Sequence, residues 1–375
     1  MSIQQLLLKG YGGASVTGGT ITTNGSYTVH TFTSSGSLVV AGVDLPAVQY
    51  LVVGGGGSGG TDNSGGGGGG GVLSSVPGRP GGGPTGAVDP AVPMTAGTYA
   101  ITVGAGGNIM ATNPPPSAMQ GADGDDSTLA YNGGTITATG GGGGGYMSAT
   151  HVGPGPGADD GRPGGSGGGG GAPWPSPTGG GDGGTGISNQ GYPGYQGRPT
   201  SPGLPSPNYP GGGGGGAAEA GKTNPEGAPY SSSGGDGILN DIDGNSYYYG
   251  GGGGGRGYVY QAGDGGKGGG GGGNACGYPT DAPSYPPQPP TIAPQGGGEA
   301  RNAGQNGGFY SPQSVTGTNP YGSGRNAGQG GTNTGGGGGG LWTPTPAPPQ
   351  PTGIYYSANA GRGGPGIVII RYTSI

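Results

Sequence analysis

Hydrophobic residues that follow the two-residue period of β-strands are concentrated towards the two ends of the chain. Near the N-terminus, residues 26–33 (SYTVHTFT) alternate and are rich in β-forming side chains, and residues 37–40 and 49–53 follow after turn-like breaks. The chain closes with residues 366–372 (GIVIIRY), its most strongly β-forming stretch. Strands at both ends predict one closed domain, in which the first and last elements pair at a common base.

Shorter β-type segments lie between these ends. Residues 98–103 (TYAITV) and 135–139 (TITAT) are predicted strands, and residues 121–129 (GADGDDSTL) predict a polar turn that leads into another strand. His30 lies in the first predicted strand. A lone histidine there is expected to face solvent or to have its polar atoms satisfied, and not to bind a ligand.

The remainder of the chain is dominated by glycine runs. Residues 54–60 and 65–71 are joined by the short turn 61–64, and further runs recur from Gly140 to the C-terminal strand, most densely in 250–273. Such runs cannot form a helix or an ordinary strand, because glycine loses the most backbone freedom on ordering and has no side chain to pack. They are either flexible linkers or polyglycine-II helices bundled through lateral backbone hydrogen bonds.

The physics of the backbone favours an anchored bundle. Polyproline-II geometry has three residues per turn and a rise of about 3.1 Å, and chains without Cβ atoms can approach closely enough for lateral N–H···O=C bonds. Each bond contributes about 0.5–1.5 kcal/mol, whereas ordering each residue costs about 1–2 kcal/mol. An isolated run should therefore not fold, but runs anchored on real strands can. A collagen-like triple helix is not supported, because no sustained Gly-X-Y period appears. Silk-like stacking needs β-prone side chains, which the glycine runs lack.

We therefore predict a β-strand base plus a polyglycine-II helix bundle, with essentially no α-helix. Its predicted parts are an N-terminal attachment segment (1–25), a β-rich base with the first glycine runs (26–139), the bundle with variable loops (140–366) and a closing strand (367–375). Runs that alternate in direction place connections 146–163, 185–210, 238–249, 274–295 and 341–360 far from the base. Connections 172–178, 217–233, 258–264 and 309–321 then fall near it, with Tyr258 and Tyr260 as packing residues.

Aromatic residues gather in the connections predicted to lie far from the base. Tyrosine supplies rigid, amphipathic contact area at low entropic cost, with Ser, Gly and Asn as adaptable partners, as in antibody combining sites. The alternative for any single tyrosine is packing against proline at the end of the bundle. The candidate receptor-binding residues are Tyr192, Tyr195, Tyr209, Tyr247, Tyr248, Tyr249, Tyr278, Tyr285, Trp342, Tyr355 and Tyr356.

Composition narrows the function classes. The 375 residues include 113 glycines, 38 prolines and 22 tyrosines but only 2 phenylalanines, so order must come mainly from backbone hydrogen bonds. Charged residues make up 7% and the net charge is −6, which disfavours nucleic acid as a partner. Cys276 is the only cysteine, so no intrachain disulfide forms. Without a signal-peptide pattern at the N-terminus or an apolar run of about 18 residues, we expect assembly in a host cytoplasm and no membrane insertion.

One segment matches a nucleotide-binding sequence motif but lacks the sequence context that the motif needs. Residues 216–223 (GAAEAGKT) match the phosphate-binding loop, but that loop needs a buried strand before it and a helix after it. Here a glycine run precedes the motif and residues 224–227 (NPEG) follow it. In a chain this rich in glycine, we interpret the match as chance.

Candidate catalytic and metal-binding groups are equally sparse. Asp123, Asp125 and Asp126 have the spacing of neither an EF-hand loop nor a nonapeptide β-roll repeat. The pairs 159–160 and 241/243 are the remaining clustered carboxylates, and the sequence places neither in a cleft. With two histidines and one cysteine, the chain offers no nucleophile–base pairing. We expect no enzymatic activity, no cofactor and no metal site.

The order of these segments resembles a known family. HTFTSSGSLVV, YLVVGGGGSGG, TYAITVGAGG, GADGDDSTLA and TITATGGGGGG are followed by many glycine runs and the final GIVIIRY. Over about residues 26–375, this order resembles the glycine-rich domain of bacteriophage tail and fibre proteins, including the fibre-tip adhesins of T-even-like phages. The resemblance implies a polyglycine-II sandwich that presents variable loops to bacterial surface receptors, with no catalytic residue.

Three functions follow as hypotheses. The first is a phage virion adhesin on a tail fibre or surface appendage, which binds a bacterial outer-surface protein or glycan. Its N-terminus would contact another virion fibre or tail protein or form a homo-oligomer; those adhesins have a larger attachment region than residues 1–25, so the manner of attachment stays open. The second is a purely structural decoration or filament protein. The third, an ice-binding protein, needs shorter loops and smaller outward residues than these connections have.

Overall fold

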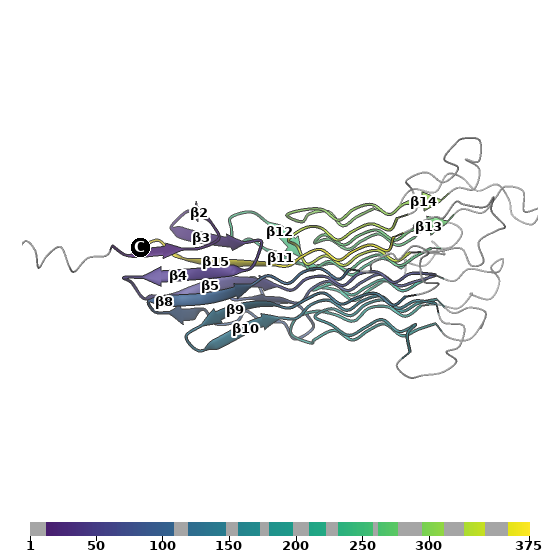
Figure 1. The fold of residues 1–375 in the computed structure, drawn as a ribbon, viewed down its shortest axis with the longest axis horizontal. Coiled ribbons are helices and arrows are strands. Elements are labelled where there is room, and N and C mark those ends of the chain that lie inside the picture. Colours follow the sequence, from purple (N-terminus) through teal and green to yellow (C-terminus); the bar gives the residue numbers. More distant parts are fainter. Residues whose placement is uncertain are drawn as a thin grey trace, which may run out of the picture.

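The chain folds into an elongated molecule with β-sheets at one end and a bundle of extended segments at the other (Figure 1). No helix occurs in the residues that the structure describes, which confirms the predicted all-β class. The computed structural model describes residues 13–108, 119–147, 157–172, 180–197, 210–222, 232–257, 262–276, 295–310, 326–341 and 359–375.

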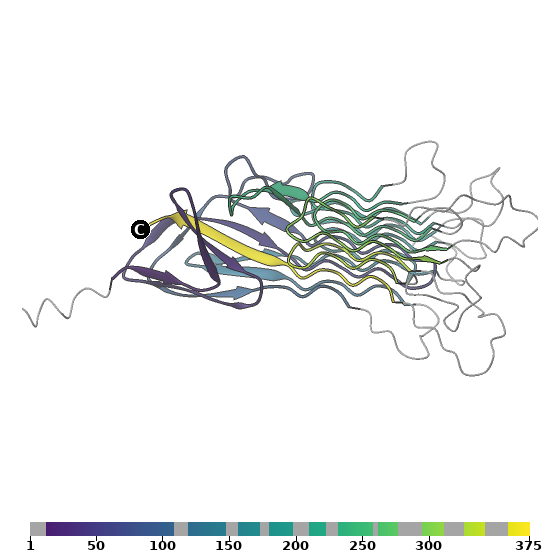
Figure 2. The same ribbon diagram turned by 90° about the horizontal axis from the view of Figure 1, so that it is seen from above.

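A six-stranded antiparallel sheet joins the two ends of the chain. The C-terminal strand β15 (Ile367–Thr373) lies inside it, with β3 (Tyr27–Phe32) on one side and β5 (Leu45–Val53) on the other (Figure 2). The predicted pairing of first and last elements is therefore confirmed. The order is β2-β3-β15-β5-β6, in which β2 is Thr20–Asn24 and β6 is Val72–Ser74, and β7 (Val92–Met94) also pairs with β5.

A second, five-stranded sheet completes the base. Its order is β1-β4-β8-β9-β10, with β1 at Ser15–Thr17, β4 at Gly36–Ala41, β8 at Gly97–Thr102, β9 at Ser127–Tyr131 and β10 at Gly134–Ala138. Strands β1 and β2 lie within the predicted attachment segment 1–25. They pair with β4 and β3, so residues 15–24 are part of the base sheets, while residues 1–12 lie outside the described part.

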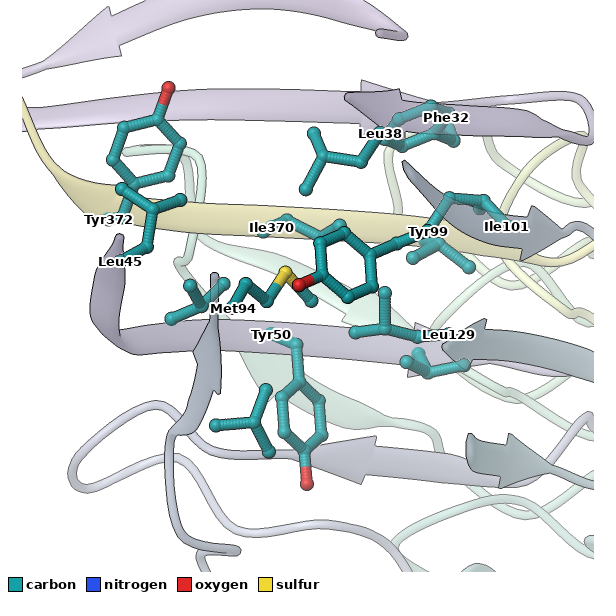
Figure 3. Close-up of a cluster of buried hydrophobic side chains, with 14 of the residues drawn as sticks. Phe32, Leu38, Leu45, Tyr50, Met94, Tyr99, Ile101, Leu129, Ile370 and Tyr372 are labelled. Atoms are coloured by element: carbon teal, nitrogen blue, oxygen red, sulfur yellow. The ribbon is translucent and has the colours of Figure 1, made fainter. Parts of the chain in front are cut away.

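The hydrophobic core fills the space between the two sheets. Alternating residues turn inward from each strand, so that Leu38, Ile101 and Leu129 face Ile370 and Met94 (Figure 3). Burial of such side chains contributes about 1.5–3 kcal/mol each. This small core supplies the anchor that the glycine runs lack.

His30 is a satisfied structural residue of this base. Its Nδ1 lies 2.8 Å from the carbonyl oxygen of Gly18, and its Nε2 lies 3.0 Å from the hydroxyl of Tyr372. The side chain is fully buried, and burial lowers the pKa of His30. The interpretation of His30 as a satisfied residue is confirmed.

A smaller cluster covers the other face of the six-stranded sheet. Val29, Leu51 and Ile369 pack there against Ile242 and Tyr249. The last two come from the hairpin of β11 (Ile238–Asn240) and β12 (Tyr247–Tyr249). Elsewhere, β13 (Ala275–Cys276) and β14 (Phe309–Tyr310) form a short parallel pair.

The glycine-rich segments run back and forth along the long axis of the molecule (Figure 1). We call a segment that leads away from the β-sheets an outward pass and one that returns an inward pass, and the end opposite the sheets the distal end. The central inward pass, 65–71, donates its amides to three different neighbours in strict rotation. The donor–acceptor pairs are Gly65–Gly145, Gly68–Gly142 and Gly71–Thr139; Gly66–Gly212 and Gly69–Gly215; Gly67–Gly338 and Gly70–Gly335.

This rotation has the period of three that polyproline-II geometry requires. The outward pass 54–60 repeats the pattern: Gly54, Gly57 and Gly60 all donate to pass 65–71. The close spacing of the passes explains the glycine. A Cβ built on Gly57 or Gly67 would lie well under 3.0 Å from a backbone carbonyl of a neighbouring pass. The predicted polyglycine-II bundle requires both features, the period of three and passes too close for a Cβ.

Passes at the edge of the bundle tolerate side chains. In pass 191–197, Gly191 and Gly197 are buried, while Pro193 and Gln196 between them are exposed. With three residues per turn, only every third residue of such a pass must face the interior. Passes of this type carry glycine at every third position, a signal that counting glycine-dense runs does not detect.

Overlooking edge passes made part of the predicted loop placement wrong. Residues 157–164 already return to the base and 165–172 lead outward, so Ala172 ends at the distal end, where its amide binds Asn63. Connection 238–249, predicted to be distal, is the hairpin packed on the base sheet. Connections 172–178, 258–264 and 309–321 were predicted to lie near the base, but the described residues that flank 173–179, 258–261 and 311–325 are distal. Segment 217–233 was predicted to be one connection near the base, but the base turn 217–219 interrupts it. Tyr258 and Tyr260 lie outside the described residues.

Carboxylate side chains supply acceptors along the edges of the bundle, where a neighbouring backbone carbonyl is missing. The side-chain Oδ1 atoms of Asp126, Asp123, Asp160, Asp236 and Asp264 accept from the amides of Gly140, Gly143, Asp182, Lys267 and Gln295, respectively. Asp123 also forms an ion pair with Arg162 at 2.7 Å. Two of the three carboxylates considered for calcium thus complete the bundle instead.

Candidate recognition site at the distal end

The two ends of the bundle differ in how the passes are joined. At the base, inward passes turn into outward passes through short described turns such as 187–190, 267–269 and 332–334. At the distal end, the described passes stop before segments that, except for 258–261, are longer than these turns; we call all of them the distal connections. These are residues 109–118, 148–156, 173–179, 198–209, 223–231, 258–261, 277–294, 311–325 and 342–358, all outside the described part of the chain.

Six of the predicted receptor-binding residues fall in the distal connections. They lie outside the described residues, so their placement stays a prediction. They are Tyr209, Tyr278, Tyr285, Trp342, Tyr355 and Tyr356.

Two further candidates lie on the side of the bundle. Tyr192 and Tyr195 are half-buried in the edge pass 191–197, and their amides donate to Gly216 and Gly213 at 3.0 and 2.8 Å. The structure therefore places both in a pass and not in a distal connection, with Tyr195 three residues before connection 198–209.

The remaining three candidates, Tyr247, Tyr248 and Tyr249, form β12 beside the base. Tyr249 is fully buried against the six-stranded sheet, and burial raises the pKa of its hydroxyl. The ammonium of Lys267 lies over the ring of Tyr248, 5.3 Å from the ring centre, and forms an ion pair with Glu299 at 2.7 Å. These contacts make the three tyrosines part of the base, and their predicted distal position is wrong.

The centre of the distal end is formed by the turn 61–64, which we call the distal turn. Asp62 and Asn63 both have left-handed backbone conformations, with φ of 60° and 48°. Non-glycine residues adopt this region at a cost, and Asn and Asp adopt it most readily. Asp62, Asn63 and Ser64 are all buried, so the turn is enclosed and not displayed.

A buried charge lies beside this turn. Arg256 is fully buried, and its Nη1 donates to Oδ1 of Asn63. Burial raises the pKa of Asp62 to about 6, and the nearby charge of Arg256 opposes part of that shift. Sequence reasoning missed this cluster, although one signal was present: Arg256 interrupts an otherwise continuous glycine run.

Other ionisable groups in the described residues form structural contacts. Asp241 pairs with Arg79 at 2.6 Å and Asp243 with Arg301 at 2.7 Å, so this carboxylate pair binds the hairpin to its neighbours. Among the described residues, no group of three or more His, Cys, Asp or Glu side chains could hold a metal ion. That part of the chain also contains no helix that could span a membrane.

The phosphate-binding motif does not have its required context. Residues 217–219 form a base turn between two passes, with no helix after them in the described part. The ammonium of Lys222 pairs with Glu219 at 2.5 Å. The interpretation of this match as chance is consistent with both observations.

Comparison with known proteins identifies one family. A family model described as a glycine-rich domain matches residues 33–309. The match begins before β4 and ends at the first residue of β14, so it covers most of the bundle and the base strands from β4 to β10, but not β1, β2, β3 or β15. No curated protein matches the chain.

Proposed function

Because the chain belongs to the glycine-rich domain family, we propose that it is a bacteriophage adhesin whose distal connections bind a receptor on the bacterial surface. In this proposal the protein is part of the virion, on a tail fibre or another surface appendage. It has no enzymatic role. The receptor is an outer-surface protein or a glycan, and the base attaches to another virion protein.

The observation that carries this proposal is the difference between the two ends of the bundle. Apart from the hairpin 238–249, the passes within 157–366 are joined at the base by short turns, whereas the distal connections include segments as long as 277–294 and 342–358. Their sequences are rich in Tyr, Pro, Ser and Asn, a composition suited to adaptable recognition. A protein that only fills space gains nothing from elaborating one end.

The bundle supports recognition by limiting the entropy lost on binding. Loops whose two ends are held by hydrogen-bonded passes lose less freedom on binding than loops without such a scaffold, which increases affinity without new contacts. Loops on a hydrogen-bonded scaffold can also vary in sequence without altering the fold. The segment order that resembles phage fibre-tip adhesins adds independent support.

Loop replacement tests the proposal. Residues 198–209 and 277–294 are each replaced by a short Gly-Ser linker, and binding of the labelled protein to a panel of bacterial cells is measured. We expect at least a tenfold loss of binding, with the melting temperature retained. The matched control replaces Asn245 and Ser246, exposed at the tip of the base hairpin, by glycine, and should bind as wild type does.

Unchanged binding by the loop variant would overturn the proposal. Electron microscopy of the native particle then tests the structural alternative. Repeated side-by-side contacts between copies through the distal connections would identify a decoration or filament protein.

A further inference from the structure

The distal turn contacts the ends of five different passes. Each of these passes stops within two residues of a distal connection. The contacts come from Met119, which follows 109–118, and from Met147, Ala172, Arg256 and Leu341, which precede 148–156, 173–179, 258–261 and 342–358.

Every residue of the turn takes part in these contacts. Thr61 exchanges two bonds with Met119, of 2.9 and 2.7 Å. The carbonyl oxygen of Asp62 accepts from the amide of Met147 at 2.9 Å. Ser64 accepts from the amide of Arg256 at 3.2 Å through its carbonyl. Its hydroxyl accepts from the amide of Leu341 at 2.9 Å and donates to the carbonyl of Gly60 at 2.5 Å.

Asn63 alone joins three passes. Its carbonyl oxygen accepts from the amide of Ala172 at 2.8 Å, and its Oδ1 accepts from Nη1 of Arg256. Its Nδ2 donates to Sδ of Met147 at 3.0 Å. Hydrogen bonds among buried groups are costly to leave unmade, so these passes are held in one arrangement.

We propose that Asn63 is a positioning residue for receptor recognition: it fixes the relative positions at which distal connections 148–156, 173–179 and 258–261 leave the bundle. This inference rests on the proposed adhesin function. It assigns control of the recognition surface to a buried residue outside the distal connections. Receptor preference therefore depends on a side chain that does not touch the receptor.

The chain offers a matched control for this role. Asn333 lies in the base turn 332–334 with φ of 57°, close to the 48° of Asn63. Asn63→Gly and Asn333→Gly both keep a residue that tolerates the left-handed backbone. The first removes the contacts to Arg256 and Met147, whereas the second removes a side chain at the opposite end of the bundle.

The experiment measures hydrogen exchange at the amides of Met147, Ala172 and Arg256 in the full-length protein. We expect Asn63→Gly to accelerate exchange at Met147 and Arg256 at least tenfold, because the side-chain contacts that hold these two residues are lost. The amide of Ala172, whose acceptor is the backbone carbonyl of residue 63, and the amides of pass 250–254 should stay protected. Asn333→Gly should leave all three rates as in wild type. Equal rates in Asn63→Gly and wild type would overturn the proposal, and so would equal acceleration by both variants.

A second variant keeps the test decisive if Asn63→Gly does not fold. Asn63→Asp retains the oxygen that accepts from Arg256 but loses the donor to Met147. It should accelerate exchange at Met147 and leave Arg256 protected. Acceleration at both amides, or at neither, would contradict the assigned contacts.

Cell binding on the same proteins separates this inference from the proposed function. Asn63→Gly should change the relative binding to different bacterial strains at least fivefold, whereas Asn333→Gly should not. Accelerated exchange with unaltered strain preference would overturn the positioning role. If wild type binds no bacterium, the proposed function fails, while the exchange rates still establish whether Asn63 holds the three passes.

Discussion

The amide of Gly67 donates to the carbonyl oxygen of Gly338 at 2.8 Å, which joins the first glycine hairpin to the last outward pass. The carbonyl of Gly67 accepts in turn from Gly253 at 2.8 Å. Three segments that are far apart in the sequence thus meet at one residue without any side chain. The bundle is therefore held by long-range backbone bonds at its centre as well as by the hydrophobic base.

Gly67→Ala should destabilise the protein strongly. The added Cβ would lie well under 3.0 Å from the carbonyl of Gly57, which cannot move without breaking its own bonds. We expect a loss of roughly 1–3 kcal/mol or more in the free energy of unfolding, read as a lower midpoint in urea. Gly298→Ala is the matched control, because a Cβ at Gly298 meets nothing within 4 Å. It should change stability by less than about 1 kcal/mol, and equal effects of the two substitutions would refute the close packing of passes.

Ile370→Ala should weaken the base. Ile370 is fully buried in the core between the two sheets, so removing it leaves a cavity that costs about 2–5 kcal/mol. Ile21→Ala serves as the control because Ile21 is 49% exposed on β2. Urea unfolding followed by tyrosine fluorescence should give a clear loss for the first variant and almost none for the second. Similar midpoints for both would show that β15 does not anchor the fold.

Asp126→Ala tests whether carboxylates complete the edges of the bundle. The Oδ1 of Asp126 accepts from the amide of Gly140 at 2.9 Å, so its removal should cost about 0.5–1.5 kcal/mol. Neighbouring Asp125 is also exposed, but it binds the bundle through its backbone, with its carbonyl accepting from Gly55. Asp125→Ala should therefore leave the melting temperature unchanged. The idea fails if both variants melt together.

Asp62→Asn should reveal a buried charge at the distal turn. The pKa of Asp62 is raised from 3.8 to about 6, because burial disfavours the ionised form. In the described residues its Oδ1 has no hydrogen-bond partner. Wild type therefore loses stability as the pH rises through this interval, whereas the neutral amide does not. The variant should melt higher than wild type at pH 7.5 and at the same temperature near pH 4. A difference that is equal at both pH values would contradict the raised pKa.

Tyr248→Ala and Tyr278→Ala should have opposite consequences. Tyr248 is part of the base hairpin and contacts Lys267, so its loss should lower the melting temperature without altering cell binding. Tyr278 belongs to connection 277–294, and its loss should reduce binding at an unchanged melting temperature. A binding defect in the Tyr248 variant would contradict this prediction and indicate that the base takes part in recognition.

Much of the architecture was predictable because its causes are local. Alternation in 26–33 and 366–372 predicted β3 and β15 and their common base. The glycine runs predicted passes without helix. Loop placement failed because edge passes such as 157–164 and 191–197 need glycine only on one face. The every-third-residue glycines of 191–197 and the scattered glycines of 157–164 escaped a search for continuous runs. Each missed pass reversed the expected direction of the next.

The candidate site was predicted less completely. The distal location of 277–294 and 342–358 followed from direction counting, whereas the tyrosines of β12 were assigned to the wrong end. Asn63 and Arg256 were not identified, because neither belongs to a recognisable motif. Their importance arises from neighbours such as Met147 and Ala172, which are remote in sequence.

The amino-acid sequence by itself determined which segments could become strands and which could only pack as bare backbone. Side-chain alternation and the absence of Cβ atoms act within a few residues, so they can be read locally. Only the tertiary structure decided which passes are neighbours, which end each connection occupies, and that the distal turn joins five of them. The physical reason is that these choices are made by backbone amides and carbonyls, which are the same in every glycine and therefore carry no local record of their partners.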